Sequence, residues 1–289
     1  MKILPNDECW CGSKLKYKKC HLQSDNMLKI KNRERCVVPS RDLIKNTFQI
    51  EAIRESAKRN IEILDYVSEH IAEGISTEEI DRLVVEKTKQ LGAVAATLNY
   101  EGYPKSVCTS INDVVCHGIP SPKQFLQNGD IITIDASTIY NGYFSDSARM
   151  FMIGDVKPDV QKLVRVAKES LEVGLKKVIP WKPLGDMGDA INQFVIANGY
   201  SVVREIGGHG VGLEFHEEPW VSYVEEPGKG MIMAPGMIFT IEPMINMGKA
   251  NVVMDSEDGW TIYTEDGLPS AKWEIMVLVT EEGYEVLAY

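Results

Sequence analysis

The Asn141-Gly142 pair, set between two long strand-like runs, constrains the fold of this chain more than any other feature. Asn-Gly favours a type I′ turn, which joins two antiparallel strands through a two-residue loop and so sets their register. Because strand side chains alternate between faces, this register places Asp135 and Asp146 on one face as diagonal neighbours. The expected pairs are Tyr140 with Tyr143, Ser137 with Asp146 and Asp135 with Ala148.

The surroundings of these aspartates favour a bound cation. Residues 131–135 are largely apolar, and a partly buried pair of like charges is costly unless a proton or a cation compensates it. Taken alone, the pair is equally consistent with solvated side chains beside a turn. Glu242 within 237–244 and Glu274 within 272–279 repeat the pattern of an acid in an apolar strand-like run. Four such acids together indicate a shared metal site.

A histidine in a glycine-rich segment supplies a fifth donor. Residues 207–212 read Gly-Gly-His-Gly-Val-Gly, and we expect the glycines to let the backbone turn sharply and expose His209. No Walker-type lysine follows, so the segment does not match a phosphate-binding loop. Four carboxylates and one imidazole suit a divalent ion such as Mn²⁺, Fe²⁺, Co²⁺ or Zn²⁺.

Charge and hydropathy exclude several classes of protein. No run reaches the roughly 18 to 20 apolar residues of a membrane helix, and the first residues lack a secretory signal, so we expect a cytoplasmic protein with no membrane partner. The net charge is −11, which disfavours nucleic-acid binding by the body of the chain. Residues 1–35 are the exception, with nine Lys/Arg against four Asp/Glu. This basic head suits phosphate or an acidic protein surface, although a merely solvated charge run fits equally well.

The order of predicted elements repeats. Two amphipathic helices are expected over 50–73 and 77–91, followed by strands that include the hairpin, and the same order of helices and then strands returns after residue 156. This predicts an α+β fold of two similar halves, 40–155 and 156–289, which face each other across an antiparallel sheet. No sequence repeat proves the relationship.

The N-terminal segment offers a second metal site. Cys9, Cys11, Cys20 and His21 form a tetrahedral zinc set within 13 residues, in a loop too small to fold without a metal; the alternative is unconnected surface thiols. The pattern closely resembles the SEC-C motif at the end of the bacterial SecA translocation motor, which implies one structural zinc. We expect this zinc-binding motif over 1–24, a linker over 25–40 and a catalytic domain over 41–289. The loop carries four basic side chains: Lys14, Lys16, Lys18 and Lys19. They lead to the hypothesis that the loop docks to the ribosome or to a nascent-chain factor, with docking to nucleic acid alone as the weaker version.

Taken in chain order, the five donors resemble the ligand set of the pita-bread metallopeptidases: Asp135, Asp146, His209, Glu242 and Glu274. The resemblance extends over about residues 45–289. Four flanking segments look like those of type I methionine aminopeptidases: 102–108, 112–120, 208–212 and 215–219. The resemblance implies the pita-bread (creatinase/aminopeptidase) fold, with pseudo-twofold halves around an antiparallel sheet. It also implies removal of the initiator methionine from nascent proteins and peptides when the second residue is small.

The resemblance further implies a role for each ligand. Two divalent ions (Mn, Fe, Co or Zn) would activate a water, with Asp135 on one ion, His209 and Glu242 on the other, and the remaining two acids, Asp146 and Glu274, between them. Glu242 would also carry the proton to the leaving amine. Ile275 departs from the family pattern, because a histidine is expected after the last glutamate.

Two histidines and five further side chains complete the expected site. The resemblance puts His117 and His216 beside the scissile carbonyl, where imidazole donors can stabilise an oxyanion. Both histidines would also contact substrate. The resemblance further implies a pocket for the methionine side chain, whose unbranched thioether packs well against aromatic edges and a small thiol: Tyr100, Tyr103, Cys108, Phe215 and Trp260. Each pocket residue could equally be ordinary core.

Two other functions are compatible with parts of this pattern. A prolidase or proline-specific aminopeptidase could share the ligands, but such proteins carry a large N-terminal domain, and only about 40 residues precede the catalytic part here. An inactive pita-bread protein that binds the ribosome or RNA would be marked by lost ligands, whereas all five are present.

Overall fold

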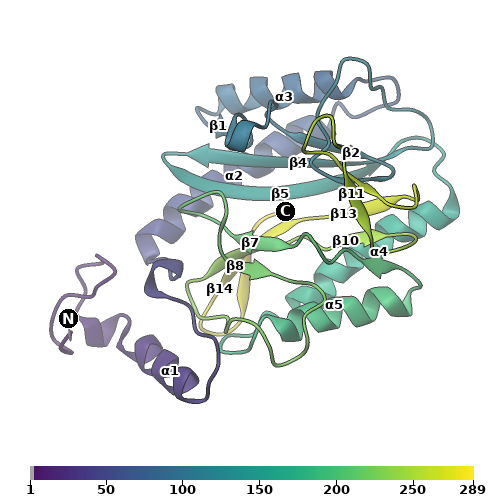
Figure 1. Ribbon diagram of the computed structural model, residues 1–289. Helices are drawn as coiled ribbons and strands as arrows, with labels where there is room; N and C mark the ends of the chain where they lie inside the picture. The colour runs from purple at the N-terminus through teal and green to yellow at the C-terminus, as the bar shows by residue number, and fades with distance from the viewer. Residues whose placement is uncertain (1–2) are drawn as a thin grey trace.

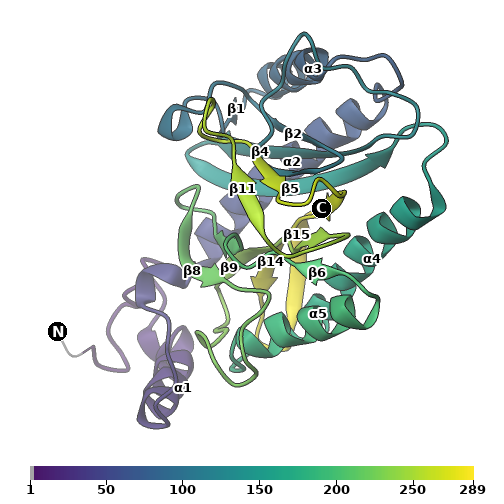
Figure 2. The ribbon, with the colours of Figure 1, turned by 45° about the vertical axis from the view of Figure 1, so that its right-hand side comes forward.

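A computed structural model describes residues 3–289 (Figures 1 and 2). The helices are α1 (Leu22–Arg33), α2 (Thr47–Ser68), α3 (Thr77–Gln90), α4 (Pro158–Leu175) and α5 (Gly185–Ala197). The strands are β1 (Val94–Ala95), β2 (Cys108–Ile111), β3 (Val114–Cys116), β4 (Ile131–Tyr140), β5 (Tyr143–Met152), β6 (Ser201–Val202), β7 (Gly208–Gly210), β8 (Glu217–Val221), β9 (Ile238–Ile241), β10 (Met244–Asn246), β11 (Val252–Met254), β12 (Ile262–Thr264), β13 (Ser270–Lys272), β14 (Ile275–Val279) and β15 (Tyr284–Ala288). Strand pairs within the sheets are antiparallel.

Two helical layers enclose the strands, with α2 and α3 over β4 and β5, and with α4 and α5 on the opposite side (Figures 1 and 2). Each layer has its own core: Leu64 and Ile80 pack with Ile134 in the first half, and Leu163 and Met187 pack in the second. The predicted α+β fold with two similar halves is confirmed. The expected single sheet is divided into four, of four, three, three and five strands.

The β4–β5 hairpin has the predicted register. Tyr140 pairs with Tyr143 across the Asn141-Gly142 turn, and both turn residues have positive φ, as a type I′ turn requires. Asp135 lies opposite Ala148. Helix α2 covers this hairpin with apolar side chains, and its first turn is fixed by a capping box between Asn46 and Gln49.

The strands that carry the two glutamates are not continuous, which corrects the prediction of acids inside buried strands. The run 237–246 divides into β9 and β10 around Glu242-Pro243, where proline lacks the N–H that a strand ladder needs. The run after Ser270 divides into β13 and β14 around Glu274. At this break the Glu274 backbone bonds to Ala148, the residue opposite Asp135. At Glu274 the second half therefore bonds directly to the hairpin of the first half.

Helix α1 extends to Arg33, within the segment 25–40 that the sequence predicts as a linker. The helix is largely polar, so its periodicity is weak, but it is held by specific contacts. Asp25 is buried and accepts a 2.6 Å hydrogen bond from the Tyr17 hydroxyl, as well as an ion pair with Arg41. Leu28 joins the core of the α4–α5 half. Within residues 3–289, no helix combines the length and apolarity needed to cross a membrane.

Candidate active site

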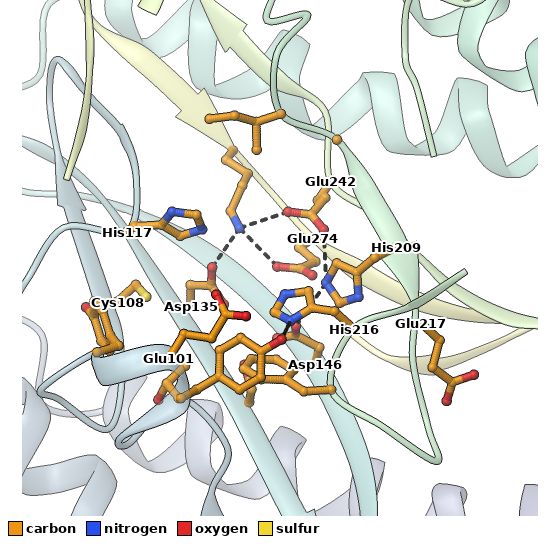
Figure 3. Close-up of a pocket in the computed structure, with 18 of the residues that line it drawn as sticks. Glu101, Cys108, His117, Asp135, Asp146, His209, His216, Glu217, Glu242 and Glu274 are labelled. Atoms are coloured by element: carbon orange, nitrogen blue, oxygen red, sulfur yellow. Dashed lines mark hydrogen bonds and ion pairs between the residues drawn. The ribbon is translucent and has the colours of Figure 1, made fainter. Parts of the chain in front are cut away.

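A cavity of about 640 Å³ lies between the two halves (Figure 3). All twelve side chains that the sequence assigned to the active site line it: Tyr100, Tyr103, Cys108, His117, Asp135, Asp146, His209, Phe215, His216, Glu242, Trp260 and Glu274. They come from β2, β4, β5, β7 and the strand breaks, together with loops before β2 and around β3, β8 and β12. The fold thus gathers residues separated by up to 174 positions of sequence around one cavity.

Three donors are arranged to accept a metal ion. Ligand atoms of Asp146, His209 and Glu274 all lie within 4.8 Å of one another. His209 Nδ1 lies 3.0 Å from the Gly210 carbonyl, which places a ring proton on Nδ1, and Nε2 faces Asp146 and Glu242 at 3.6 Å each. Metal-binding histidines are commonly oriented by such a bond.

The Glu274 carboxylate gives a further indication of a cation. Its Oε1 atom is buried and finds no hydrogen-bond partner among the described residues, which is costly for an acceptor unless a cation binds there. Carboxylate oxygens and one imidazole are suitable donors for hard or borderline divalent ions. The residues therefore fit a divalent metal.

The glycines beside His209 serve a different purpose from the one expected. His209 lies in strand β7 rather than at a sharp turn. A Cβ atom on Gly210 would lie 2.1 Å from the Glu218 carbonyl oxygen, and one on Gly208 would lie 2.3 Å from the Tyr223 hydroxyl. Close packing of β7 against its neighbours, and not a bend of the backbone, requires the glycines.

The sequence analysis missed Lys272, which is the central cation of the cluster. Its side chain is 3% exposed, and Nζ lies 2.6 Å from Asp135 Oδ2, 3.1 Å from Glu274 Oε2 and 3.2 Å from Glu242 Oε2. Figure 3 draws these contacts as dashed lines that run to the three carboxylates. The available signal was a lysine two residues before Glu274 in the same strand-like run, because strand alternation puts both on one face. The other cavity residues left unassigned by the sequence are Thr97, Glu101, Ser137, Ile206, Gly207, Glu217, Glu218 and Trp220.

Burial and neighbouring charges perturb the pKa values of the cluster. Burial raises the pKa of Asp146 to about 6, and burial together with the neighbouring acids raises that of Glu274. Burial alone would lower the pKa of Lys272, but Asp135, Glu274 and Glu242 raise it well above its ordinary value. Burial would likewise raise the pKa of Glu242, yet the Lys272 and His209 charges lower it overall. Asp146 and Glu274 are therefore the carboxylates whose charged forms most need a compensating positive charge.

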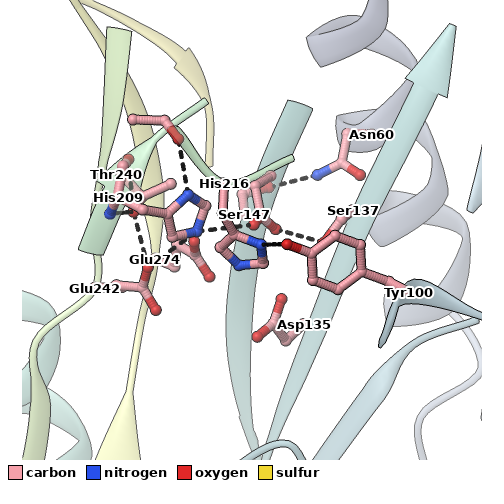
Figure 4. Close-up of polar contacts among 12 residues, drawn as sticks. Asn60, Tyr100, Asp135, Ser137, Ser147, His209, His216, Thr240, Glu242 and Glu274 are labelled. Carbon is pink, nitrogen blue, oxygen red and sulfur yellow. Dashed lines mark hydrogen bonds and ion pairs between the residues drawn. The ribbon is translucent and has the colours of Figure 1, made fainter. Parts of the chain in front are cut away.

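Backbone and hydroxyl contacts fix the position of Glu242 (Figure 4). Thr240 Oγ1 donates a 2.7 Å hydrogen bond to Glu242 Oε1 and accepts one from the His209 backbone N–H. The Glu242 backbone N–H donates a 2.7 Å bond to the hydroxyl of Tyr223, which is buried beneath the site. Both ends of the residue are thus held.

The two remaining histidines are neutral donors. Burial lowers the pKa of His216 to about 4 and also lowers that of His117. His216 Nδ1 lies 2.8 Å from the Tyr100 hydroxyl (Figure 4), and a hydroxyl that donates to Nδ1 leaves the ring proton on Nε2. A neutral imidazole of this tautomer can donate a hydrogen bond to a substrate oxygen.

Aromatic rings form an apolar wall around the polar cluster. Tyr103 and Trp260 meet edge to face at 5.2 Å, and Tyr100 and Phe215 do so at 4.8 Å. Burial raises the pKa of Cys108, so its sulfur is a neutral thiol at this wall. This combination of aromatic edges and a small thiol suits a thioether side chain.

Ile275 does not line the cavity. Its side chain is buried in the core of the α4–α5 half, on the strand side away from the carboxylates. The residue that departs from the family pattern therefore acts in packing, and the five donors come together without a histidine at this position.

The N-terminal donors also converge. Cys9 Sγ and Cys20 Sγ lie 3.2 and 3.1 Å from His21 Nδ1, Cys11 Sγ lies 3.6 Å from Cys20 Sγ, and the four ligand atoms lie within 4.8 Å of one another. Tetrahedral coordination with Zn–S bonds of about 2.3 Å and a Zn–N bond of about 2.0 Å has S···S edges of about 3.8 Å and S···N edges of about 3.5 Å, a few tenths of an ångström longer than these separations. Donor type and spacing both fit zinc.

Comparison with known proteins defines the family. Residues 51–281 match metallopeptidase family M24, and residues 6–23 match the SEC-C motif. The chain belongs to metallopeptidase family M24. Its likeness to the prolidase of Pyrococcus furiosus, at 22% identity and a TM-score of 0.68 over 92% of this chain and 67% of that one, extends to the fold alone.

Within that family the chain groups with the methionine aminopeptidases and carries an N-terminal SEC-C motif. It is 42% identical to a methionine aminopeptidase of Chlamydia muridarum over 98% of this chain and 97% of that protein. The crystal structure of methionine aminopeptidase from Rickettsia prowazekii superposes with a TM-score of 0.83 at 38% identity, over 85% of this chain and 99% of that one.

Proposed function

We propose that this cavity removes the N-terminal methionine of nascent proteins and peptides when the second residue is small. The observation that carries the proposal is the convergence of a carboxylate–histidine cluster and an aromatic wall on one cavity. The protein groups with enzymes named for this activity. We also expect it to act in the cytoplasm.

The five predicted ligands are proposed to form the catalytic metal site. Asp146, His209 and Glu274 supply its central donors, with Glu242 beside them and Asp135 on the far side of the cluster. A divalent cation bound here would lower the pKa of a water molecule and polarise the scissile carbonyl. Mn²⁺, Fe²⁺, Co²⁺ and Zn²⁺ all suit these donors. The resemblance to the pita-bread metallopeptidases implies two ions.

Residues of the site would also act directly on the substrate. Glu242, held by Thr240 and Tyr223, would take the proton of the attacking water and deliver it to the leaving amine. His117 and His216 would donate to the oxyanion of the tetrahedral intermediate. The pocket for the methionine side chain is proposed to comprise Tyr100, Tyr103, Cys108, Phe215 and Trp260.

Peptide turnover with the metal-reconstituted protein tests the activity. The enzyme should release methionine from Met-Ala-Ser and leave an X-Pro dipeptide intact, because the cavity is lined for a thioether side chain. Met-Phe tripeptides should be poor substrates, as the resemblance to methionine aminopeptidases implies for a large second side chain. Cleavage of X-Pro but not Met-Ala-Ser, or equal turnover of Met-Ala and Met-Phe peptides, would contradict the proposal.

The N-terminal cluster is proposed to hold one structural zinc through Cys9, Cys11, Cys20 and His21. Replacing Cys9 and Cys11 with serine should remove one zinc per chain, measured by elemental analysis, while Met-Ala-Ser turnover is retained. Cys36, a free cysteine outside the cluster, offers the matched control. These point variants are sharper than deletion of residues 1–36, because deletion would also remove Leu28 from the core. Unchanged zinc content would contradict the site.

The same module is proposed to dock the enzyme to the ribosome or to a nascent-chain factor. Its four loop lysines are exposed, as a docking surface requires: Lys14, Lys16, Lys18 and Lys19. Their joint replacement by glutamine should weaken co-sedimentation with ribosomes, while tripeptide turnover is unchanged. The control is the same replacement at four exposed lysines of the catalytic body: Lys58, Lys123, Lys229 and Lys249. Equal loss in both variants would reduce the effect to net charge, and no loss in either would refute docking through this loop.

A further inference from the structure

The carboxylate cluster contains a cation supplied by the chain itself. We propose that the Lys272 ammonium occupies one of the two cation positions, so that the cavity holds a single divalent ion on the side of Asp146, His209 and Glu274. This inference rests on the proposed metallopeptidase site and changes its composition. It assigns Lys272, which family resemblance did not, as a residue that determines how many metal ions bind.

The position of Lys272 is set by the backbone. Lys272 ends β13, where it pairs with Met244 of β10, and its carbonyl accepts a hydrogen bond from Thr133 Oγ1. Lys272 and Glu274 are two residues apart and their side chains both reach the cavity. At 3% exposure the ammonium is surrounded by protein, and a buried ammonium needs carboxylate partners.

The oxygens of the cluster are divided between two groups of contacts. Lys272 Nζ contacts Asp135 Oδ2, Glu242 Oε2 and Glu274 Oε2. The atoms on the other side are Asp146 Oδ2 and Glu242 Oε1, each 3.6 Å from His209 Nε2, and the unpartnered Glu274 Oε1. One set of donors therefore faces the ammonium, and the other set remains for one ion.

A second divalent ion would compete with the ammonium for the same ligands. It would need Asp135 and the carboxylates that lie between the two positions, and these oxygens already neutralise Lys272. Two cations that share these buried carboxylates repel each other strongly, because little solvent screens them. Asp135 would then pair with Lys272 rather than ligate metal directly.

Manganese binding to the full-length protein tests the inference. Mn²⁺ is the probe because the thiolate-rich N-terminal cluster favours zinc, so Mn²⁺ counts the carboxylate site alone. Isothermal titration should give one Mn²⁺ per chain for the wild type, with the electron paramagnetic resonance signal of an isolated ion. Lys272→Gln should bind a second Mn²⁺ and give the signal of a spin-coupled pair. The affinity of the variant for this second ion should be at least tenfold higher than any second-site affinity of the wild type.

Two further variants keep the result interpretable. Lys272→Met removes the charge without adding an acceptor, and serves if the glutamine variant does not fold. Lys249→Gln removes one charge from an exposed lysine and should keep the wild-type stoichiometry. Two coupled Mn²⁺ ions in the wild type would overturn the inference, and so would one ion in both the wild type and the Lys272 variants.

Turnover measured on the same samples separates this inference from the proposed function. Methionine release from Met-Ala-Ser by a wild type that binds two ions would leave the peptidase assignment intact and remove only the role of Lys272. Correct stoichiometry without methionine release would support the role of Lys272 and remove the peptidase assignment.

Discussion

Replacing Tyr223 with phenylalanine should loosen Glu242 without replacing any of the five proposed metal ligands. The Tyr223 hydroxyl accepts a 2.7 Å hydrogen bond from the Glu242 backbone N–H, and Tyr223 is only 1% exposed. Phenylalanine keeps the ring but leaves a buried N–H without its partner. Such an orphaned donor costs about 1 to 3 kcal/mol, which corresponds to roughly 5- to 150-fold in the unfolding equilibrium.

Urea denaturation in EDTA would measure this cost, since chelation removes any difference in metal affinity. Tyr284→Phe is the matched control, because Tyr284 is 43% exposed, and its effect should stay within about 0.5 kcal/mol. With metal restored, kcat of Tyr223→Phe should fall about tenfold or more, since a displaced Glu242 delivers protons less well. A Tyr223→Phe protein as stable and as active as the control would refute the reasoning.

Three further predictions concern the site and its scaffold. Glu242→Gln should lower kcat at least about 100-fold with an unchanged circular dichroism spectrum, because it removes the proton carrier but little volume; activity within about tenfold of wild type would contradict this. Burial would raise the pKa of Asp258, but hydrogen bonds from the Thr261 side chain and the Trp260 backbone lower it overall. The contribution of the Asp258 carboxylate to stability is therefore fully present above about pH 4 and is lost only as the pH falls further. Asp258→Ala should therefore loosen Trp260 and raise KM for methionyl peptides by one factor throughout about pH 6 to 8, and a pH-dependent factor would count against the assignment. Ile53→Ala should cost about 2 to 5 kcal/mol in urea denaturation because Ile53 is fully buried, whereas Phe48→Ala, at 74% exposure, should be nearly neutral; equal effects would contradict the packing.

Several local features could be predicted because short-range chemistry controls them. The Asn141-Gly142 turn sets the hairpin register, and strand alternation then brings Asp135 and Asp146 to one face. The N-terminal zinc ligands lie within 13 residues, so their convergence needs only a small loop. Apolar periodicity located α2 and α3 to within about five residues of their ends.

Other features could not be predicted, because they depend on contacts between distant segments. Helix α1 has a weak apolar pattern, and it is held by Asp25, whose partner Arg41 lies 16 residues away. Strand β7 forms because β8 and β9 flank it, and its glycines permit that close approach. Neither feature leaves a periodic signal in the sequence.

The active site likewise combines features that the sequence predicts with one that depends on the tertiary structure. Residue type and chain order alone predicted the five donors, because carboxylates in apolar runs are costly unless a proton or a cation compensates them. Only the tertiary structure decided where the positive charge comes from. Lys272 and Asp135 are 137 residues apart, and their ion pair exists because Glu274 bonds to Ala148 directly opposite Asp135. Alternation predicts that Lys272 shares a face with Glu274, but the packing of the two halves determines that this face meets the other carboxylates rather than water.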